Sequence, residues 1–167
     1  RGHVRSPHKV ITAHAVKQRL CMKIKQDLIV DTWDAVMLSE TGLPDRFYVP
    51  ETAIPPHYLE KSDRETVCTY KGEAQYFHLR TEGRLMENVV WVYPEPWTDF
   101  APDVAKIKNY LGFYSTTFDT VLLNDVLIQV DSSEVAVDQT MLESPTVDRT
   151  LLEKPGRYAR LPYNQLS

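Results

Sequence analysis

The chain has 167 residues, of which 43% are hydrophobic and 25% are charged, as is typical of one globular domain with room for a core. Its net charge of −4 and its scattered lysines and arginines argue against nucleic acid as the main partner, because phosphate binding needs a concentrated basic surface. No apolar run approaches the roughly 18 residues of a membrane helix, so we also expect no membrane partner.

The cysteines and histidines do not indicate a metal site. Cys21 and Cys68 form no CxxC pair, and the histidines lack the spacing of metal ligands, so we expect neither zinc nor another metal. The sequence alone does not decide whether the two cysteines form a disulfide. Because two cysteines without a recognisable signal peptide fit a reducing compartment, we expect a cytoplasmic protein.

The first half of the chain predicts β-strands. Alternating polar and apolar residues at 19–25 are typical of a half-buried strand, and a short turn leads into the next one. Prolines fix φ and remove backbone donors, so the proline-rich segment that follows is predicted to hold only a short strand, then a helical turn and a loop. The expected strands cover residues 9–13, 19–25, 27–32, 35–38 and 47–49, and the helical turn and loop cover residues 51–60.

The second half predicts two hairpins, one further strand and one helix. Gly72 can supply a positive φ at the first hairpin turn, and Asn124-Asp125 forms the second turn. Pro102 near the first turn favours a short helix over residues 102–111. The expected strands cover residues 65–70, 74–79, 88–93, 118–123 and 126–130.

These elements fit one domain over residues 1–130. From residue 131 the chain is polar with little periodicity, and we interpret residues 131–167 as an irregular C-terminal arm that packs on the body or on a partner subunit. A homodimer held by this arm is one expectation about partners.

Three blocks place charged and hydrogen-bonding groups among aromatic residues, in or beside predicted strands. The first, ETGLPDRFYVP at residues 40–50, is followed by CTYKGEAQY at residues 68–76 and NVVWVYPEP at residues 88–96, and a Phe-Tyr pair comes later at residues 113–114. In this order and spacing the blocks resemble the "domain of unknown function 427" family over about residues 20–125.

The resemblance implies a compact β-tent fold, in which two antiparallel sheets meet at an angle. Relatives of that architecture include cereblon-type ligand modules and B-type methionine sulfoxide reductases, and many carry zinc on CxxC pairs, which this chain lacks. The family has been labelled a nucleotidyltransferase, but the sequence has no glycine-rich phosphate loop and no paired-aspartate metal motif, so we expect no nucleotide. Three positions differ from the family's usual residues, namely Phe47, Thr69 and His78.

The same blocks contain the residues that we expect to form a site. Glu40 and Arg46 are either an ion pair that stabilises a turn, or a general base with its orienting cation or a carboxylate clamp. Lys71 is either a solvated turn lysine or a cationic anchor, and burial would depress its pKa and allow acid–base work. Cys68 is either a packed thiol or a nucleophile activated by Lys71.

Aromatic residues would line such a site. Trp91 and Tyr93 fall on one face of their strand, and Tyr76 and His78 share a face of theirs, so adjacent strands would present an aromatic wall with polar tips. Buried hydroxyls need partners, so core packing alone explains this wall poorly. We assign Glu40, Lys71, His78 and Tyr93 as catalytic, and Arg46, Tyr48, Cys68, Tyr70, Tyr76 and Trp91 as substrate-binding.

We therefore predict a small-molecule enzyme without metal, nucleotide or other cofactor. It would use Glu40 or His78 as base, and cationic and phenolic groups to stabilise an oxyanion. The expected reaction is an isomerisation, cyclisation or hydrolysis of an oxygen-rich metabolite, with secondary metabolism as its setting. Two alternatives stay open: a non-catalytic small-molecule-binding module, and a structural protein that holds a partner with its C-terminal arm.

Overall fold

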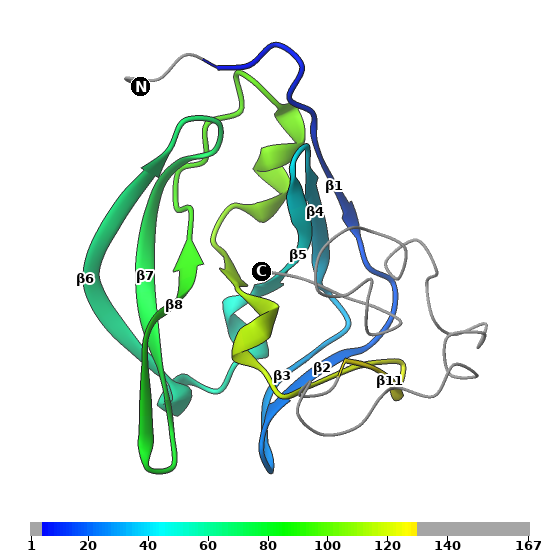
Figure 1. The fold of residues 1–167 in the computed structure, drawn as a ribbon, viewed down its shortest axis with the longest axis vertical. Helices are drawn as coiled ribbons and strands as arrows, with labels where there is room; N and C mark the ends of the chain where they lie inside the picture. The colour runs from blue at the N-terminus through cyan, green and yellow to red at the C-terminus, as the bar shows by residue number, and fades with distance from the viewer. Residues whose placement is uncertain (1–4, 130–167) are drawn as a thin grey trace.

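Two antiparallel sheets form residues 5–129, the part of the chain that this computed structural model describes (Figure 1). The strands are β1 (Ile11–Ala15), β2 (Leu20–Ile24), β3 (Asp27–Thr32), β4 (Val36–Glu40), β5 (Leu43–Pro50), β6 (Leu59–Cys68), β7 (Gly72–Thr81), β8 (Arg84–Val92), β9 (Tyr110–Phe113), β10 (Thr120–Leu123) and β11 (Val126–Gln129). The larger sheet has seven strands in the order β1-β4-β5-β9-β8-β7-β6, and the smaller has four in the order β11-β10-β2-β3. The mainly β prediction, with two antiparallel sheets, is confirmed.

Side chains alternate between two apolar layers along the central strands of the large sheet. Phe47, Val90 and Val92 pack in the layer shared with the smaller sheet. Their neighbours Tyr48 and Trp91 point to the opposite face, into a second cluster. This is the period-2 alternation of a strand that is buried on both faces, and it turns the predicted aromatic residues away from the smaller sheet.

The helical segments in residues 5–129 are short 3-10 turns. They are η1 (Glu51–Ala53), η2 (Pro56–Tyr58), η3 (Pro102–Ile107) and η4 (Ser115–Thr117). The predicted helix over residues 102–111 is therefore present, but it ends at Ile107. Asn109 then adopts a left-handed conformation, with φ +61°, and its N–H donates to Tyr93 O at 3.1 Å, which turns the chain into β9.

The strand in the proline-rich segment is longer than predicted. β5 spans eight residues, with Pro44 second and Pro50 last, so both prolines lie near its ends. A proline is tolerated at such positions because few ladder hydrogen bonds are lost there. The predicted turn at Asn124-Asp125 is present, since both residues have the positive φ of a type I′ turn, 51° and 65°.

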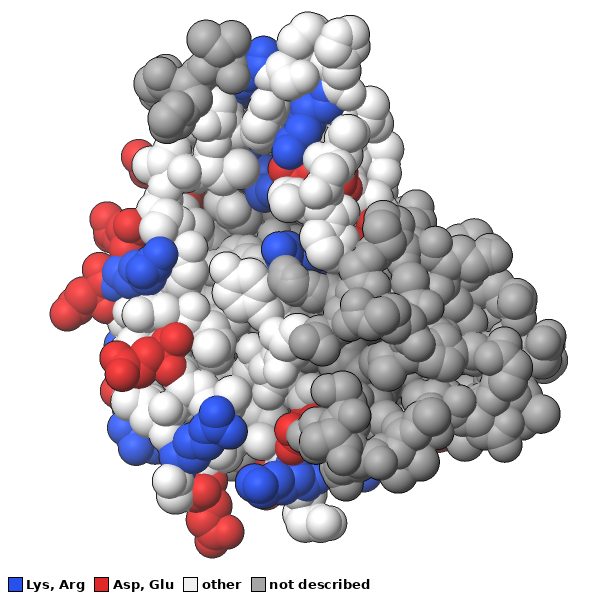
Figure 2. All heavy atoms as spheres, viewed as in Figure 1, with Lys and Arg blue, Asp and Glu red and all other residues white. Residues whose placement is uncertain are grey.

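Charged side chains of both signs mix on the face of the molecule shown in Figure 2, including the edge over β6 and β7. β6 is a ten-residue edge strand of sequence LEKSDRETVC, and its charges protect the free edge from pairing with another strand. Within residues 5–129, no helix combines the length and the apolar character needed to cross a membrane. The predicted C-terminal arm lies outside the described residues.

Candidate functional site

A row of residues crosses the large sheet on the face turned away from the smaller sheet. Tyr48 in β5 pairs with Gly112 in β9, Gly112 pairs with Trp91 in β8, and Trp91 pairs with Tyr76 in β7. Residues paired in this way point to the same face of a sheet. Because Gly112 has no side chain, the Tyr48 and Trp91 rings meet above it, and Trp91 Nε1 donates a hydrogen bond to Tyr48 Oη at 3.0 Å.

This row forms one side of a pocket with a volume of about 160 Å³. Its walls are mostly aromatic rings, with two cationic groups and several phenol oxygens, a composition typical of small-molecule sites. The lining residues are Leu43, Arg46, Tyr48, Lys71, Tyr76, Trp91, Tyr93 and Tyr114.

Arg46 is held between two aromatic rings of the pocket. Its guanidinium carbon lies 5.5 Å from the centroid of Trp91 and 5.0 Å from that of Tyr114, and the two rings make an edge-to-face contact at 4.8 Å. Both contacts are cation–π interactions, which fix the plane of the guanidinium. Its Nη1 atom is buried and has no hydrogen-bond partner among the described residues.

Lys71 is placed by the tight turn between β6 and β7. Its carbonyl accepts a hydrogen bond from Trp97 N at 2.8 Å, and its own N–H donates to Cys68 O at 3.3 Å. The next residue, Gly72, has φ +119°, and a Cβ there would lie 3.3 Å from Trp97 N. Gly72 is thus required by backbone geometry, and the turn leaves the Lys71 side chain buried beside the pocket.

Lys71 forms a buried ion pair with Glu40 Oε1, and Lys9 binds the other carboxylate oxygen, Oε2, at 2.9 Å. Burial alone would raise the pKa of Glu40, but the charges of Lys71 and Lys9 outweigh it and lower that pKa. Burial would likewise lower the pKa of Lys71, but the Glu40 carboxylate in direct contact with it outweighs this effect and raises that pKa. Both groups are therefore held in their charged forms.

The expected pairing of Glu40 with Arg46 and the expected depression of the Lys71 pKa are wrong, whereas the carboxylate clamp at Arg46 stays a prediction. Glu40 pairs with Lys71 and Lys9, whereas Arg46 lies between aromatic rings, because Arg46 is directed to the Trp91 side of the pocket. The pKa of Lys71 is raised where we expected burial to depress it, since the counter-charge is in direct contact. Glu40, with a lowered pKa and two ammonium partners, is also poorly suited to act as a general base.

The buried phenols are held in their neutral form. Burial raises the pKa of Tyr48 and that of Tyr93. Neutral phenols can donate hydrogen bonds to an oxygen atom of a bound molecule. Together with Lys71 and Arg46, the pocket therefore presents donors and positive charge rather than bases.

A family model described as "Domain of unknown function (DUF427)" matches residues 12–124, which is more than half of the chain. The chain belongs to this family. The match includes all three sequence blocks and every residue that lines the pocket, but it begins after Lys9. A comparison with curated proteins finds no significant match.

Six of the ten predicted site residues of this DUF427 domain line the pocket, and Glu40 lies behind Lys71. His78 is placed elsewhere: it lies beyond Tyr76 along β7, opposite a bulge in β8, where the β7–β8 register shifts between Phe77 and Leu79. At this bulge His78 Nδ1 accepts a hydrogen bond from Asn88 N at 2.9 Å. His78 therefore stabilises the bulge and does not belong to the pocket, contrary to our prediction.

Cys68 and Tyr70 also lie outside the pocket lining of the DUF427 domain. Cys68 is a half-buried free thiol that packs at the edge of the second apolar cluster, and Cys21 is free as well. Tyr70 packs edge-to-face on Phe100 at 4.9 Å, and its hydroxyl accepts a hydrogen bond from Ser6 N at 2.8 Å. Cys68 and Tyr70 thus support the Lys71 turn rather than contact the pocket interior.

Sequence reasoning missed three residues of the site. Tyr114 belongs to the Phe-Tyr pair noted in the motif, and Leu43 lies within the first block, so both had a signal that we did not assign. Lys9, which binds Glu40, had no such sequence signal, because it precedes the blocks and lies 31 residues before Glu40.

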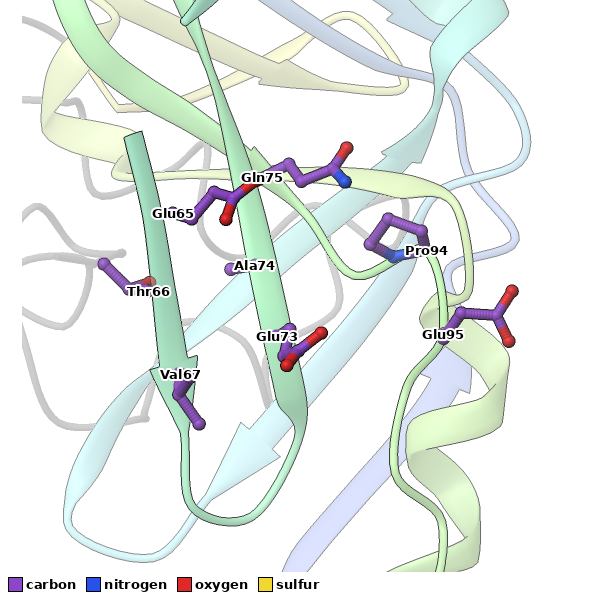
Figure 3. Close-up of a pocket in the computed structure, with 8 residues that line it drawn as sticks. All are labelled: Glu65, Thr66, Val67, Glu73, Ala74, Gln75, Pro94 and Glu95. Carbon is purple, nitrogen blue, oxygen red and sulfur yellow. The ribbon is translucent and has the colours of Figure 1, made fainter. Parts of the chain in front are cut away.

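A larger hollow of about 350 Å³ lies between β6, β7 and the segment after β8 (Figure 3). Its charged groups are three glutamates, Glu65, Glu73 and Glu95, and all three are exposed to solvent. Solvent screens exposed charges, so they bind a ligand weakly. No three His, Cys, Asp or Glu side chains in residues 5–129 are grouped as metal ligands. We place the candidate site of the DUF427 domain in the smaller, aromatic pocket.

Proposed function

We propose that the aromatic pocket binds a small, anionic, oxygen-rich organic molecule through Arg46 and Lys71. The observation that carries this proposal is the Arg46 Nη1 donor, which is buried without a hydrogen-bond partner among the described residues. A buried donor left unpaired costs free energy. A carboxylate or phosphate oxygen at this point would accept a charge-assisted hydrogen bond from the guanidinium.

The other groups of the pocket fit the same ligand class. Lys71 supplies a second positive charge, and Tyr93 adds a phenol that can donate to a further oxygen atom, whereas the Tyr76 hydroxyl is hydrogen-bonded to Thr66 Oγ1 at 2.8 Å. The volume of about 160 Å³ is below the range of about 300–1,000 Å³ that drug-sized ligands occupy. The ligand is therefore a small metabolite. A cytoplasmic location belongs to this proposal, and the two free thiols are consistent with a reducing compartment.

Titration calorimetry with acetate, malonate and inorganic phosphate tests the proposal. We expect saturable binding of at least one of these probes to the wild type, and an affinity reduced about 10- to 100-fold in Arg46→Leu, because a charge-assisted hydrogen bond is lost. The matched control is Arg84→Leu, an exposed arginine at the far end of the strand that carries Trp91. Equal affinity in Arg46→Leu, or no saturable binding by the wild type, would refute the proposal.

Catalysis at the same pocket is a second candidate function. Tyr93 is a buried, neutral phenol that lines the same pocket as Lys71, and such a pair of groups can stabilise an oxyanion as it forms in an isomerisation, cyclisation or hydrolysis. Since Glu40 is held by two lysines and His78 lies at the bulge, the proton acceptor would be water or the substrate itself. The second candidate is therefore a cofactor-independent enzyme that uses Tyr93 and Lys71 at this pocket, with secondary metabolism as one setting.

Product formation separates the two candidates. A binding module returns its ligand unchanged, whereas an enzyme of this kind converts it, and NMR spectra of the incubated ligand distinguish the two. For the enzyme, we expect Tyr93→Phe to lower turnover by at least about tenfold, with a smaller effect on ligand affinity. Unchanged turnover in Tyr93→Phe would exclude Tyr93 as the stabilising donor.

A further inference from the structure

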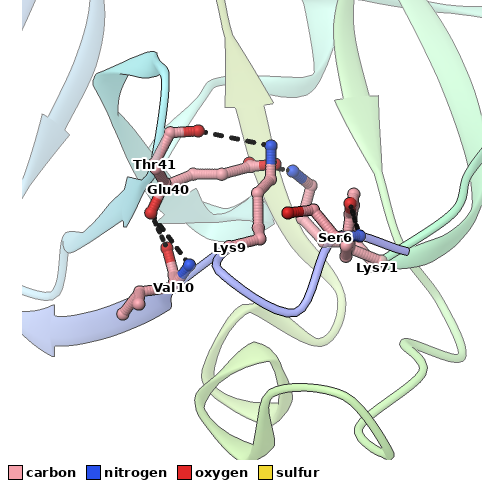
Figure 4. Close-up of polar contacts among 7 residues, drawn as sticks. Ser6, Lys9, Val10, Glu40, Thr41 and Lys71 are labelled. Carbon is pink, nitrogen blue, oxygen red and sulfur yellow. Dashed lines mark hydrogen bonds and ion pairs between the residues drawn. The ribbon is translucent and has the colours of Figure 1, made fainter.

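Residues 5–10 form a strap that runs beside the β6–β7 turn and joins β1 (Figure 4). At its start, Arg5 Nε donates to Thr69 O at 2.9 Å. At its end, Val10 N donates to Thr41 Oγ1 at 2.8 Å, and Thr41 N donates to Val10 O at 3.0 Å. The strap is thus attached to both of the sequence blocks that hold the charged groups of the site.

Lys9 extends from this strap to the carboxylate of Glu40. Its Nζ lies 2.9 Å from Glu40 Oε2 and 3.3 Å from Thr41 O, and 4.9 Å from the centroid of the Tyr70 ring. Only 17% of the Lys9 side chain is exposed, so solvent screens its charge little. Figure 4 shows Lys9 and Lys71 approaching Glu40 from the strap and from the turn.

One carboxylate is therefore shared by two ammonium groups. Glu40 can neutralise only one of them, so the group formed by Lys9, Glu40 and Lys71 carries a net charge of about +1 when all three are ionised. Arg46 adds a second positive charge at the pocket. Without Lys9, Glu40 and Lys71 would cancel and Arg46 alone would remain.

We propose that Lys9 is a positioning residue that sets the charge of the pocket and makes it prefer a dianion over a monoanion. This inference rests on the proposed anion-binding function, and it assigns a role to a segment that precedes the residues matched by the family model. A Coulomb energy is proportional to the charge of the ligand. Loss of Lys9 should therefore lower the affinity for a dianion by about the square of the factor by which it lowers the affinity for a monoanion.

The test compares malonate, a dianion near neutral pH, with acetate, a monoanion, by calorimetric titration of the full chain. In Lys9→Gln we expect the affinity for malonate to fall about tenfold and that for acetate about threefold. Lys9→Arg keeps the charge and should restore the preference for malonate. Lys17→Gln, which removes an exposed lysine between β1 and β2, should leave both affinities unchanged.

The outcomes separate this inference from the function on which it rests. If the wild type binds neither probe, the role of Lys9 fails; if it binds no inorganic phosphate either, the proposed function fails with it. If the wild type binds both, and Lys9→Gln weakens both by the same factor or weakens neither, the inference about Lys9 alone is overturned. Circular dichroism of Lys9→Gln at the titration temperature tests whether the variant is folded. Should it unfold, the same comparison is made with Lys9→Met.

Discussion

Tyr48 and Trp91 lie on strands that do not pair with each other, and a hydrogen bond of 3.0 Å joins them above Gly112. The strand between them, β9, contributes only a glycine at this point, so the two rings cover its backbone. This contact sets the positions of two pocket residues, one from the first sequence block and one from the third. The absence of a side chain at Gly112 is therefore part of the site's construction.

Gly112→Ala should destabilise the fold by about 1–3 kcal/mol, because the added Cβ would lie 2.5 Å from Tyr48 Cε2 and 2.7 Å from Trp91 Nε1. Urea unfolding measures the cost. In a Tyr48→Leu background the same substitution should cost less, since one of the clashing rings is gone. An equal cost in both backgrounds would show that the clash is not the cause.

Glu40→Gln should lower the free energy of unfolding at pH 7 by about 3–5 kcal/mol, because it leaves Lys71 buried without its counter-charge. Glu60→Gln is the matched control. Glu60 pairs with Arg80 at the surface, where both side chains are about half exposed, and an exposed pair contributes less than about 1 kcal/mol. Similar losses in the two variants would contradict the buried ion pair.

The pH dependence of stability should report the lowered pKa of Glu40. As pH falls, the unfolded chain takes up this proton near the ordinary pKa of 4.5, before the folded chain does. The stability contributed by Glu40 is therefore fully present above about pH 4.5 and is lost as pH falls through the lower, folded-state pKa. The difference between wild type and Glu40→Gln should shrink below pH 4.5, and a difference that widens there would have the wrong sign.

Tyr93 should stay protonated in alkaline solution while the protein is folded, because burial raises its pKa. Ionised tyrosine absorbs at about 295 nm, and a Tyr93 that stays protonated contributes nothing to this absorbance. The rise in absorbance of the wild type up to about pH 11 should therefore be unchanged in Tyr93→Phe. A smaller rise in the variant would mean that Tyr93 ionises in that range and is not buried as described.

His78→Ala should leave the binding of carboxylate probes unchanged, since His78 lies opposite the β8 bulge and not at the pocket. It should cost about 0.5–1.5 kcal/mol of stability, because Asn88 N–H loses its acceptor. If His78→Ala lost as much binding as Arg46→Leu, His78 would contribute to ligand binding and its placement outside the pocket would be contradicted.

Local patterns predicted much of the fold. The alternation of Val90, Trp91 and Val92 between two faces follows from the pleat of one strand, and the turn before Gly72 follows from a few adjacent residues. The limits of η3 depended instead on a long-range contact, the hydrogen bond from Asn109 to Tyr93. The pattern of residues 102–111 alone cannot predict that bond, because its acceptor, Tyr93, lies outside this segment.

The site was predicted by residue type better than by pairing. Placing Arg46, Lys71 and the aromatic residues near one another required only the sequence blocks, whereas the partner of Glu40 depended on which strand edges meet. His78 was misplaced because β8 contains two extra residues opposite it, and the backbone N–H of Asn88 in this bulge donates to the imidazole; a period-2 argument about β7 cannot detect a bulge in its partner strand. Lys9 approaches Glu40 only through the pairing of β1 with β4.

The central claim, that Arg46 binds an anion in the aromatic pocket, is tested most directly by following indole N–H resonances in an NMR titration with malonate. The account predicts that the Trp91 resonance moves saturably in the wild type and stays in place in Arg46→Leu. The resonance of Trp33, which is 62% exposed and does not line the pocket, should not move in either protein. A Trp91 resonance that stays fixed in the wild type, or moves equally in Arg46→Leu, would contradict the claim.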